Sequence, residues 1–331
     1  MKTFLKKLSG KIFPIVLLIC FCSLLKMEGA NEASKPIETG KVQIEKLSSW
    51  SLSATDSIDL NLDGKHIAFF PQSFGILGNQ ILFLNRFIPS FVTYSLEKRR
   101  MEKLVFLKHP ADKKFEACFF IDLVLTSAGI FGLEQSSGSL RKASESGEIT
   151  NVYFCTETLG SIITRVWQIN ENEFAFLDEG HKKLLIRDIS DGKLNEAPDK
   201  NGRSIEIGKA EIMCNSQGFV VLEKKKDASW LATWRTFKDG KSIPMATWKC
   251  EKVIPLDSDE RNFYFFVDDG KQPLINKFSG TSGAFIQKSF VCPKLIFSKN
   301  ITRHALIAGE NKLYLLLSDE TELSLQELNL Q

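Results

Sequence analysis

The chain has 331 residues, of which 43% are hydrophobic and 25% charged, and its 43 basic and 40 acidic side chains give a formal net charge of +3. Residues 1–29 contribute five lysines and one glutamate, so the rest of the chain carries 38 basic and 39 acidic side chains and is nearly neutral. This balance excludes the basic surface that a nucleic-acid partner would need.

The first 29 residues are typical of a secretory signal peptide. Four lysines precede an apolar run over residues 12–25, which is shorter than the about 20 residues that a membrane-spanning helix needs. We therefore expect export to the periplasm, the cell envelope or the outside of the cell. Two alternatives stay open. An uncleaved membrane anchor is one, because small residues are missing from the expected cleavage position. A lipoprotein signal is the other, because Cys20 and Cys22 lie in the apolar run, although no small residues precede them.

Residues 30–45 are polar and predict a flexible lead-in, and residues 46–331 predict one large β domain built from a repeated unit. The unit is an apolar strand, a charged or glycine turn and a second apolar strand; its clearest copy runs from Glu173 to Lys193 and ends in Asp-Gly-Lys. Successive copies start roughly 42 to 56 residues apart, which is the period of a β-propeller blade.

The sequence divides into six such units. Outside their main strands, segments 253–256 and 294–297 would supply further strands of a blade, and residues 46–60 could provide the strand that closes the ring. The apolar strands are expected at residues 65–70, 80–84, 91–96 and 104–107 in the first unit, 119–126, 129–134 and 150–155 in the second, 174–178, 183–189 and 204–207 in the third, 219–223, 230–237 and 245–248 in the fourth, 263–268, 273–278 and 284–290 in the fifth, and 305–308, 312–317 and 322–328 in the sixth.

Turns and bulky side chains both suit a propeller. Asp-Gly pairs, which adopt positive φ in tight hairpins, stand at residues 63–64, 191–192, 239–240 and 269–270. The 26 phenylalanines can fill the gaps between twisted sheets. The sequence therefore predicts an all-β fold, a β-propeller with six blades favoured. Seven blades remain an alternative if the long first unit hides another, and two β-sandwiches would not explain the repeated order.

The segment Asn61-Leu-Asp-Gly-Lys-His-Ile-Ala-Phe-Phe70 resembles the Pro-Asp-Gly-Lys-x-Ile-Ala-Phe element of TolB-like propeller repeats, with Leu62 in place of the proline. The Asp-Gly-Lys turns are also similar to those of six-bladed propellers from bacterial envelope proteins. The resemblance covers ten residues and implies a fold and export, without implying an activity.

No pattern of residues predicts a catalytic, cofactor-binding or metal-binding site. His66, His109, His181 and His304 are scattered; His66 and His304 both begin the first apolar strand of a unit, which would put them near the central channel. The acidic clusters precede turns and are expected to be solvated, although paired carboxylates could act on a glycan or hold Ca²⁺. These clusters are Asp178-Glu179, Asp257-Ser-Asp-Glu260, Asp268-Asp269 and Asp319-Glu320.

Cysteine spacing and tryptophan placement carry less information. Cys118, Cys155, Cys214, Cys250 and Cys292 show no metal-binding spacing, and we expect buried thiols and no disulfide framework. Trp50, Trp167, Trp230, Trp234 and Trp248 are expected to pack in the core, with a surface platform for a sugar or peptide as the alternative.

Three functions fit this sequence. The first is an exported, non-catalytic binding or scaffold module with a protein or glycan partner and no nucleic acid. The second is an envelope hydrolase or lyase whose carboxylates meet at the propeller channel. The third is a structural protein that contacts the membrane only through its N-terminal segment or a lipid anchor.

Overall fold

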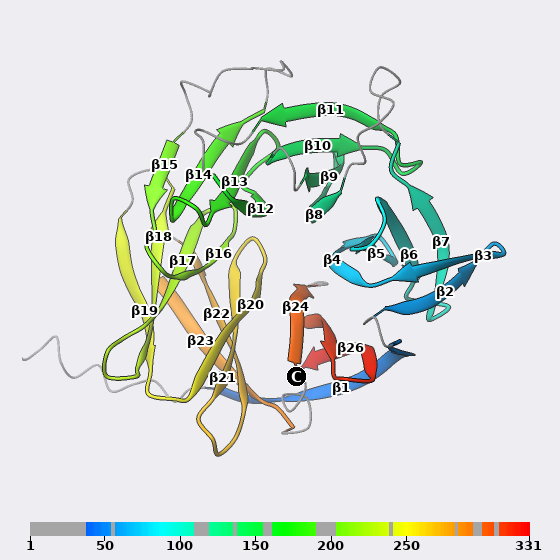
Figure 1. Ribbon diagram of the computed structural model, residues 1–331. Helices are drawn as coiled ribbons and strands as arrows, with labels where there is room; N and C mark the ends of the chain where they lie inside the picture. The colour runs from blue at the N-terminus through cyan, green and yellow to red at the C-terminus, as the bar shows by residue number, and fades with distance from the viewer. Residues whose placement is uncertain are drawn as a thin grey trace, which may run out of the picture. The chain divides into compact units, whose positions relative to one another are not determined.

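Figure 1 shows the structure, a computed structural model that describes residues 38–53, 57–108, 119–134, 138–154, 161–189, 203–237, 241–281, 284–293, 300–307 and 311–331. Every regular element among these residues is a β-strand, which confirms the all-β prediction. Apart from Glu38, they belong to one compact unit, Thr39–Gln331. Within the described ranges, no helix is long and apolar enough to cross a membrane. The expected signal segment and residues 30–37 of the expected lead-in lie outside these ranges.

The described strands form the six predicted blades, each of four antiparallel strands. The first strand of each blade faces the centre of the ring (Figure 1). The blades are β4 (Pro71–Leu77), β5 (Gln80–Asn85), β6 (Ser90–Ser95) and β7 (Arg100–Phe106); β8 (Phe120–Thr126), β9 (Gly129–Glu134), β10 (Ser139–Ala143) and β11 (Ile149–Phe154); β12 (Ile163–Gln168), β13 (Glu173–Asp178), β14 (Lys183–Asp188) and β15 (Arg203–Glu206); β16 (Glu211–Cys214), β17 (Gly218–Lys224), β18 (Trp230–Thr236) and β19 (Ser242–Trp248); β20 (Lys252–Ser258), β21 (Asn262–Asp268), β22 (Leu274–Thr281) and β23 (Ala284–Val291); and β24 (Asn300–Ile307), β25 (Lys312–Ser318) and β26 (Glu322–Leu330) with β1 (Glu38–Ser51).

The ring is closed by β1, which completes the sixth blade. It pairs with β26 from Val42 opposite Leu330 to Ser51 opposite Glu322, and on its other side it neighbours β23 of the fifth blade. Near its start, the N–H of Lys41 donates to the carbonyl of Gln331 at 2.9 Å. The first and last strands of the unit are therefore hydrogen-bonded to one another, which is a common way to close a propeller.

The closing strand is shifted toward the N-terminus from its predicted position at residues 46–60. It begins at Glu38, and β2 (Ile58–Leu62) instead pairs with β3 (Lys65–Phe69) in a separate two-stranded hairpin. Asp63 and Gly64 connect these two strands with φ of 53° and 72°, as the Asp-Gly turn predicts. The segment that resembles a TolB-like repeat is this hairpin, and it belongs to none of the six blades.

Bulky apolar side chains fill the gaps between blades, as predicted. Phe131 of the second blade and Phe174 of the third have ring centroids 5.1 Å apart, and both side chains are almost fully buried. Clusters of this kind join the other neighbouring blades. Because each sheet is covered on both faces, central strands such as β21 are apolar along their whole length.

Four blade strands were missing from the predicted units: β4, β10, β12 and β16. Three of them, β4, β12 and β16, are first strands of their blades. In β12 only Ile163 and Val166 are buried, while the other four residues are half-buried. A strand with one face on the channel has apolar residues on its other face only. The sequence analysis looked for continuous apolar runs and therefore did not predict this strand.

Candidate functional site

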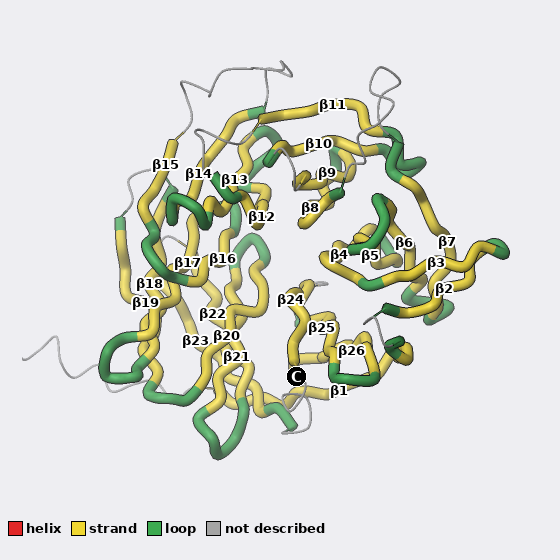
Figure 2. The backbone as a smooth tube through the Cα atoms, viewed as in Figure 1, coloured by secondary structure: helices red, strands yellow, loops and turns green. Residues whose placement is uncertain are grey.

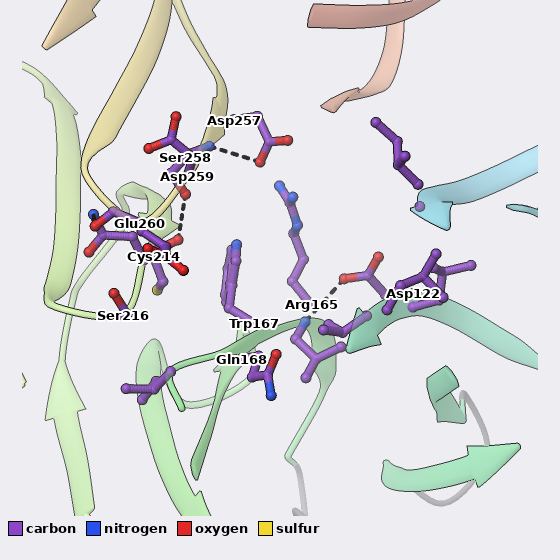
Figure 3. A pocket seen from close by; sticks show the side chains of 18 of the residues that line it. Asp122, Arg165, Trp167, Gln168, Cys214, Ser216, Asp257, Ser258, Asp259 and Glu260 are labelled. Carbon is purple, nitrogen blue, oxygen red and sulfur yellow. Dashed lines mark hydrogen bonds between the residues drawn. The ribbon is translucent and has the colours of Figure 1, made fainter. Parts of the chain in front are cut away.

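A cavity of about 610 Å³ lies among the first strands of five blades. Its walls come from β4, β8, β12, β16 and β20 and from the turns that follow β12, β16 and β20. We call it the channel cavity; Figure 3 shows the side chains that surround it. The residues that matter for its chemistry are Ser73, Asp122, Arg165, Trp167, Gln168, Glu171, Asn215, Ser216, Asp257, Ser258, Asp259 and Glu260.

Strand β12 presents Arg165 and Trp167 to the channel cavity. Residues two apart in a strand share a face, and the intervening Val166 is buried in the core between the second and third blades. The guanidinium carbon of Arg165 lies 5.1 Å from the centre of the Trp167 ring, within range of a cation–π contact. Figure 3 shows Arg165 extended from β12, with the Trp167 ring beside it. The strand thus combines a positive charge and an aromatic surface at one wall.

Asp122 on β8 ties three inner strands together. Its carboxylate accepts a hydrogen bond of 2.7 Å from the hydroxyl of Ser73 on β4 and one of 3.1 Å from the N–H of Val166 on β12. The side chain is buried, with 5% of its surface exposed. A buried carboxylate needs such donors. Asp122 therefore stabilises the packing of the inner strands that form the wall of the cavity.

Turns with the same construction border the channel cavity in three consecutive blades. The side-chain oxygen of Asn170 accepts from the N–H groups two and three residues later, at 2.9 Å each. Asn215 does the same at 3.0 and 3.1 Å, and Asp259 at 2.8 Å each. These Asx turns fix the conformation of the hairpins between the first and second strands. The border of the cavity is therefore held in shape by hydrogen bonds from the side chains of its own turns.

The border carries several carboxylates on the side of β20. Asp257 accepts a 2.8 Å hydrogen bond from the N–H of Ser258, and the hydroxyl of Ser258 donates to the carbonyl of Cys214 on β16. Glu260 is exposed, and Glu171 after β12 is exposed as well. In the part of the lining that the structure describes, acceptors for hydroxyl and N–H groups are thus combined with one basic side chain, Arg165.

Arg165 also acts on two titratable groups of β16. Burial raises the pKa of the Cys214 thiol well above its ordinary value, and the charge of Arg165 works against this rise. Desolvation likewise raises the pKa of Glu211, again opposed by Arg165. A thiol with a raised pKa is a poor nucleophile at neutral pH, so Cys214 is a packing residue.

The predicted histidine positions are partly wrong. His66 lies on the β2–β3 hairpin, with Asp59 at 3.3 Å and Asn61 at 3.1 Å, and not on a strand facing the channel. His304 lies on β24, a first strand, with its side chain outside the described part of the structure. His109 lies outside the described residues. Among described residues, no group of three or more metal-ligating side chains comes together.

The acidic clusters differ from one another. Asp257, Asp259 and Glu260 line the channel cavity. Asp178, expected to be solvated, is buried with 1% of its surface exposed. It accepts hydrogen bonds of 2.9 Å from the N–H of Ile162 and from the ring Nδ1 of His181. Burial of Asp178 acts to raise its pKa, but these hydrogen bonds outweigh that effect and leave the pKa below its ordinary value.

Four tryptophans pack in the core as predicted. Trp234 is 3% exposed, and Trp50, Trp230 and Trp248 pack against the buried clusters. Trp167 also touches such a cluster, but it lines the channel cavity. The sequence analysis allowed a sugar or peptide platform for any of the five tryptophans but did not single out Trp167, because its strand was not predicted. The alternation Arg-Val-Trp at residues 165–167 was the available signal.

The described cysteines, Cys214, Cys250 and Cys292, are free thiols. Burial raises the pKa of Cys292 to about 12. The positions of Cys118 and Cys155 lie outside the described residues.

Comparison with known proteins supports the fold and goes no further. No family model matches the chain, and no curated protein sequence matches it. The PQQ-bound form of aldose sugar dehydrogenase from Streptomyces coelicolor is similar with a TM-score of 0.53 and 12% identity, over 88% of this chain and 99% of that one. The structure of U3-55K is similar with a TM-score of 0.52 and 7% identity, over 87% and 100%. A DUF4221 member from Bacteroides vulgatus has a TM-score of 0.49 and 12% identity, over 88% and 99%. At such identities the likeness shows the propeller fold alone.

Proposed function

We propose that this protein is an exported, non-catalytic binding module of the bacterial envelope type, and that its channel cavity binds a glycan. The observation that carries the proposal is the presence of Trp167 in a cavity bordered by carboxylate, amide and hydroxyl groups. Sugars have apolar faces that pack on aromatic rings and hydroxyls that donate to carboxylates. The polar groups are placed by Asx turns and inter-strand hydrogen bonds, so the site is largely formed before a ligand arrives.

Direct binding tests this proposal. Oligosaccharides from envelope and extracellular polysaccharides are titrated into the mature protein by calorimetry, and Trp167→Ala is expected to weaken binding at least ten-fold by removing the aromatic surface. Ile286→Ala is the matched control, because Ile286 is an apolar side chain on β23, outside the cavity and 76% exposed. If a glycan binds both variants as tightly as it binds the unaltered protein, its binding site lies outside the channel cavity. If no glycan binds the protein, the proposal is overturned.

A carboxylate-dependent hydrolase or lyase is the second candidate, because Asp122, Asp257, Asp259 and Glu260 gather at one cavity. Paired carboxylates can protonate a glycosidic oxygen and activate water. However, Asp122 and Asp259 are engaged in hydrogen bonds that hold strands and turns, which favours the binding module. Release of reducing ends from any bound glycan, lost in Asp257→Asn, would establish the enzymatic alternative.

Export and anchoring belong to the proposal as well. Cell fractionation and N-terminal sequencing of the native protein would separate the alternatives: cleavage near residue 29 supports a secreted module, while an intact N-terminus in the membrane fraction supports the anchored structural protein. A lipid-modified Cys20 or Cys22 would identify a lipoprotein.

A further inference from the structure

Arg165 is a charged group that forms no ion pair with any described residue, although its charge acts on Glu211 of β16. Within the described part of the chain, its guanidinium has no ion pair and no hydrogen-bond acceptor, and its Nε is buried without a partner. Buried polar groups in folded proteins are almost always hydrogen-bonded, and leaving a charged donor unpaired costs folding free energy. The two Nη atoms of Arg165 are not among the buried unpaired atoms of the described residues, so a group that enters the cavity can pair with them.

The described surroundings of Arg165 hold it in place without a direct ion pair; its charge acts on Glu211 only at a distance beyond an ion pair. The Trp167 ring supports the guanidinium at 5.1 Å, which favours one orientation of a long side chain. The carboxylate of Asp122 accepts hydrogen bonds from the hydroxyl of Ser73 and from the N–H of Val166. The guanidinium is therefore positioned in advance, and a carboxylate that reached it could form two parallel hydrogen bonds.

The rest of the lining limits how much negative charge a ligand can carry. Among the described residues, five acidic side chains line the channel cavity against one arginine: Asp122, Glu171, Asp257, Asp259 and Glu260. At physiological ionic strength charges are screened only beyond about 8 Å, so a second anionic group near the border would meet repulsion. Neutral sugars have hydroxyls that donate to those same carboxylates. The charge pattern thus suits one anionic group among neutral hydroxyls.

We infer that the glycan bound in the channel cavity carries a single acidic sugar, such as a uronic acid, whose carboxylate pairs with Arg165. The neutral sugars next to it pack on Trp167 and donate hydroxyls to the carboxylates of β20. This inference rests on the proposed glycan-binding function. A peptide with a free C-terminal carboxylate offers the same charge, but it has no row of hydroxyl donors for the acidic border, so the saccharide is favoured.

Four matched oligosaccharides test the inference by calorimetry with the mature protein: a neutral chain, the same chain ending in one uronic acid, that chain with its carboxyl reduced to an alcohol, and a chain with a uronic acid at every position. The singly acidic chain is expected to bind at least ten-fold more tightly than its reduced form, as a charge-assisted pair allows. The fully acidic chain is expected to bind more weakly than the singly acidic one.

Two variants assign the effect to this side chain. Arg165→Gln is expected to abolish the preference for the singly acidic chain over its reduced form. Arg235→Gln is the matched control, because Arg235 on β18 also has a buried Nε without a partner in the described structure but does not line the cavity. The preference should survive in that variant.

The outcomes separate the inference from the proposed function. Equal binding of the singly acidic chain and its reduced form would overturn the inference and leave glycan binding standing. Binding of a fully acidic chain as tightly as the singly acidic one would overturn the single-charge requirement. Absence of binding by all four saccharides, or capture of a C-terminal peptide in their place, would overturn both. The ligand comparison uses unaltered protein, so it decides the question even if Arg165→Gln does not fold.

Discussion

The same inner strands contribute side chains to two regions, the apolar packing between blades and the wall of the channel cavity, and the two regions differ in the kind of side chain they use. On β12, Val166 packs among phenylalanine and leucine side chains of neighbouring blades, while the adjacent Arg165 and Trp167 line the cavity. Tight apolar packing between sheets stabilises the ring, whereas the channel wall includes polar groups such as Arg165 that form no hydrogen bond within the described structure. Stability and binding should therefore respond to different mutations. The four predictions below run from the largest expected effect on stability to the smallest.

Phe174→Ala should be the most destabilising change. Phe174 has no exposed surface and packs against Phe131 between the second and third blades. Removing a buried phenylalanine ring costs about 3–5 kcal/mol of unfolding free energy. Chemical denaturation measures the loss, and Ile286→Ala on the exposed surface of β23 should change stability by less than about 0.5 kcal/mol. Similar losses for the two would show that the packing between blades is not what stabilises the ring.

Gly40→Ala should weaken the closure of the ring. A Cβ at this position would overlap the carbonyl oxygen of Gln331 and the ring of Phe290 on β23. Forcing such an overlap costs about 1–3 kcal/mol and should make β1 more sensitive to proteolysis. Ser49→Ala, an exposed position on the same strand, should behave like the unaltered protein. Unchanged proteolysis of Gly40→Ala would argue that β1 is not required for closure.

Asp178→Asn should destabilise the protein in a pH-dependent way. Because the folded-state pKa of Asp178 lies below the ordinary 3.8, its carboxylate contributes stability above pH 3.8 that is lost as the pH falls toward the folded-state pKa. Removing the charge should cost about 1–3 kcal/mol at pH 7. The difference from the unaltered protein should shrink in denaturation experiments near pH 3. Glu179→Gln, at an exposed neighbouring residue, serves as the control, and a loss that is independent of pH would contradict the role of the charge.

Arg165→Gln should have the smallest effect on stability. Its guanidinium has no hydrogen-bond partner among the described residues, so replacement should leave unfolding free energy unchanged or raise it by up to about 1 kcal/mol. Arg141→Gln provides the contrast, because Arg141 forms a buried ion pair with Glu134 and its loss should cost about 3–5 kcal/mol. Thermal denaturation distinguishes the two, and a large loss for Arg165→Gln would mean that this residue serves the fold.

Much of the fold could be predicted because short apolar runs and turn residues indicate the blade strands from local sequence alone. The run Phe263-Tyr-Phe-Phe-Val267 must be buried on both faces wherever it lies, and the Asp63-Gly64 pair suits a tight turn by its backbone preferences alone. The predicted closing strand was misplaced for the opposite reason. Residues 38–51 are mostly polar, and β1 becomes a strand through its pairing with β26 and its place beside β23.

The candidate site was beyond sequence patterning because it is assembled from distant residues. Asp122, Arg165 and Asp257 come from three different blades and come together only at the channel cavity. Each looked like an ordinary polar residue in or beside a short strand.

By itself, the sequence determined a β-propeller with apolar packing between blades and favoured six blades, since period, turn chemistry and hydrophobic runs are local properties. Only the tertiary structure decided which strand closes the ring, that the hairpin over residues 58–69 stands outside the blades, and that Arg165 and Trp167 line the channel cavity. These features depend on which strand lies at the centre and on contacts between residues far apart in the chain, for which no local preference exists.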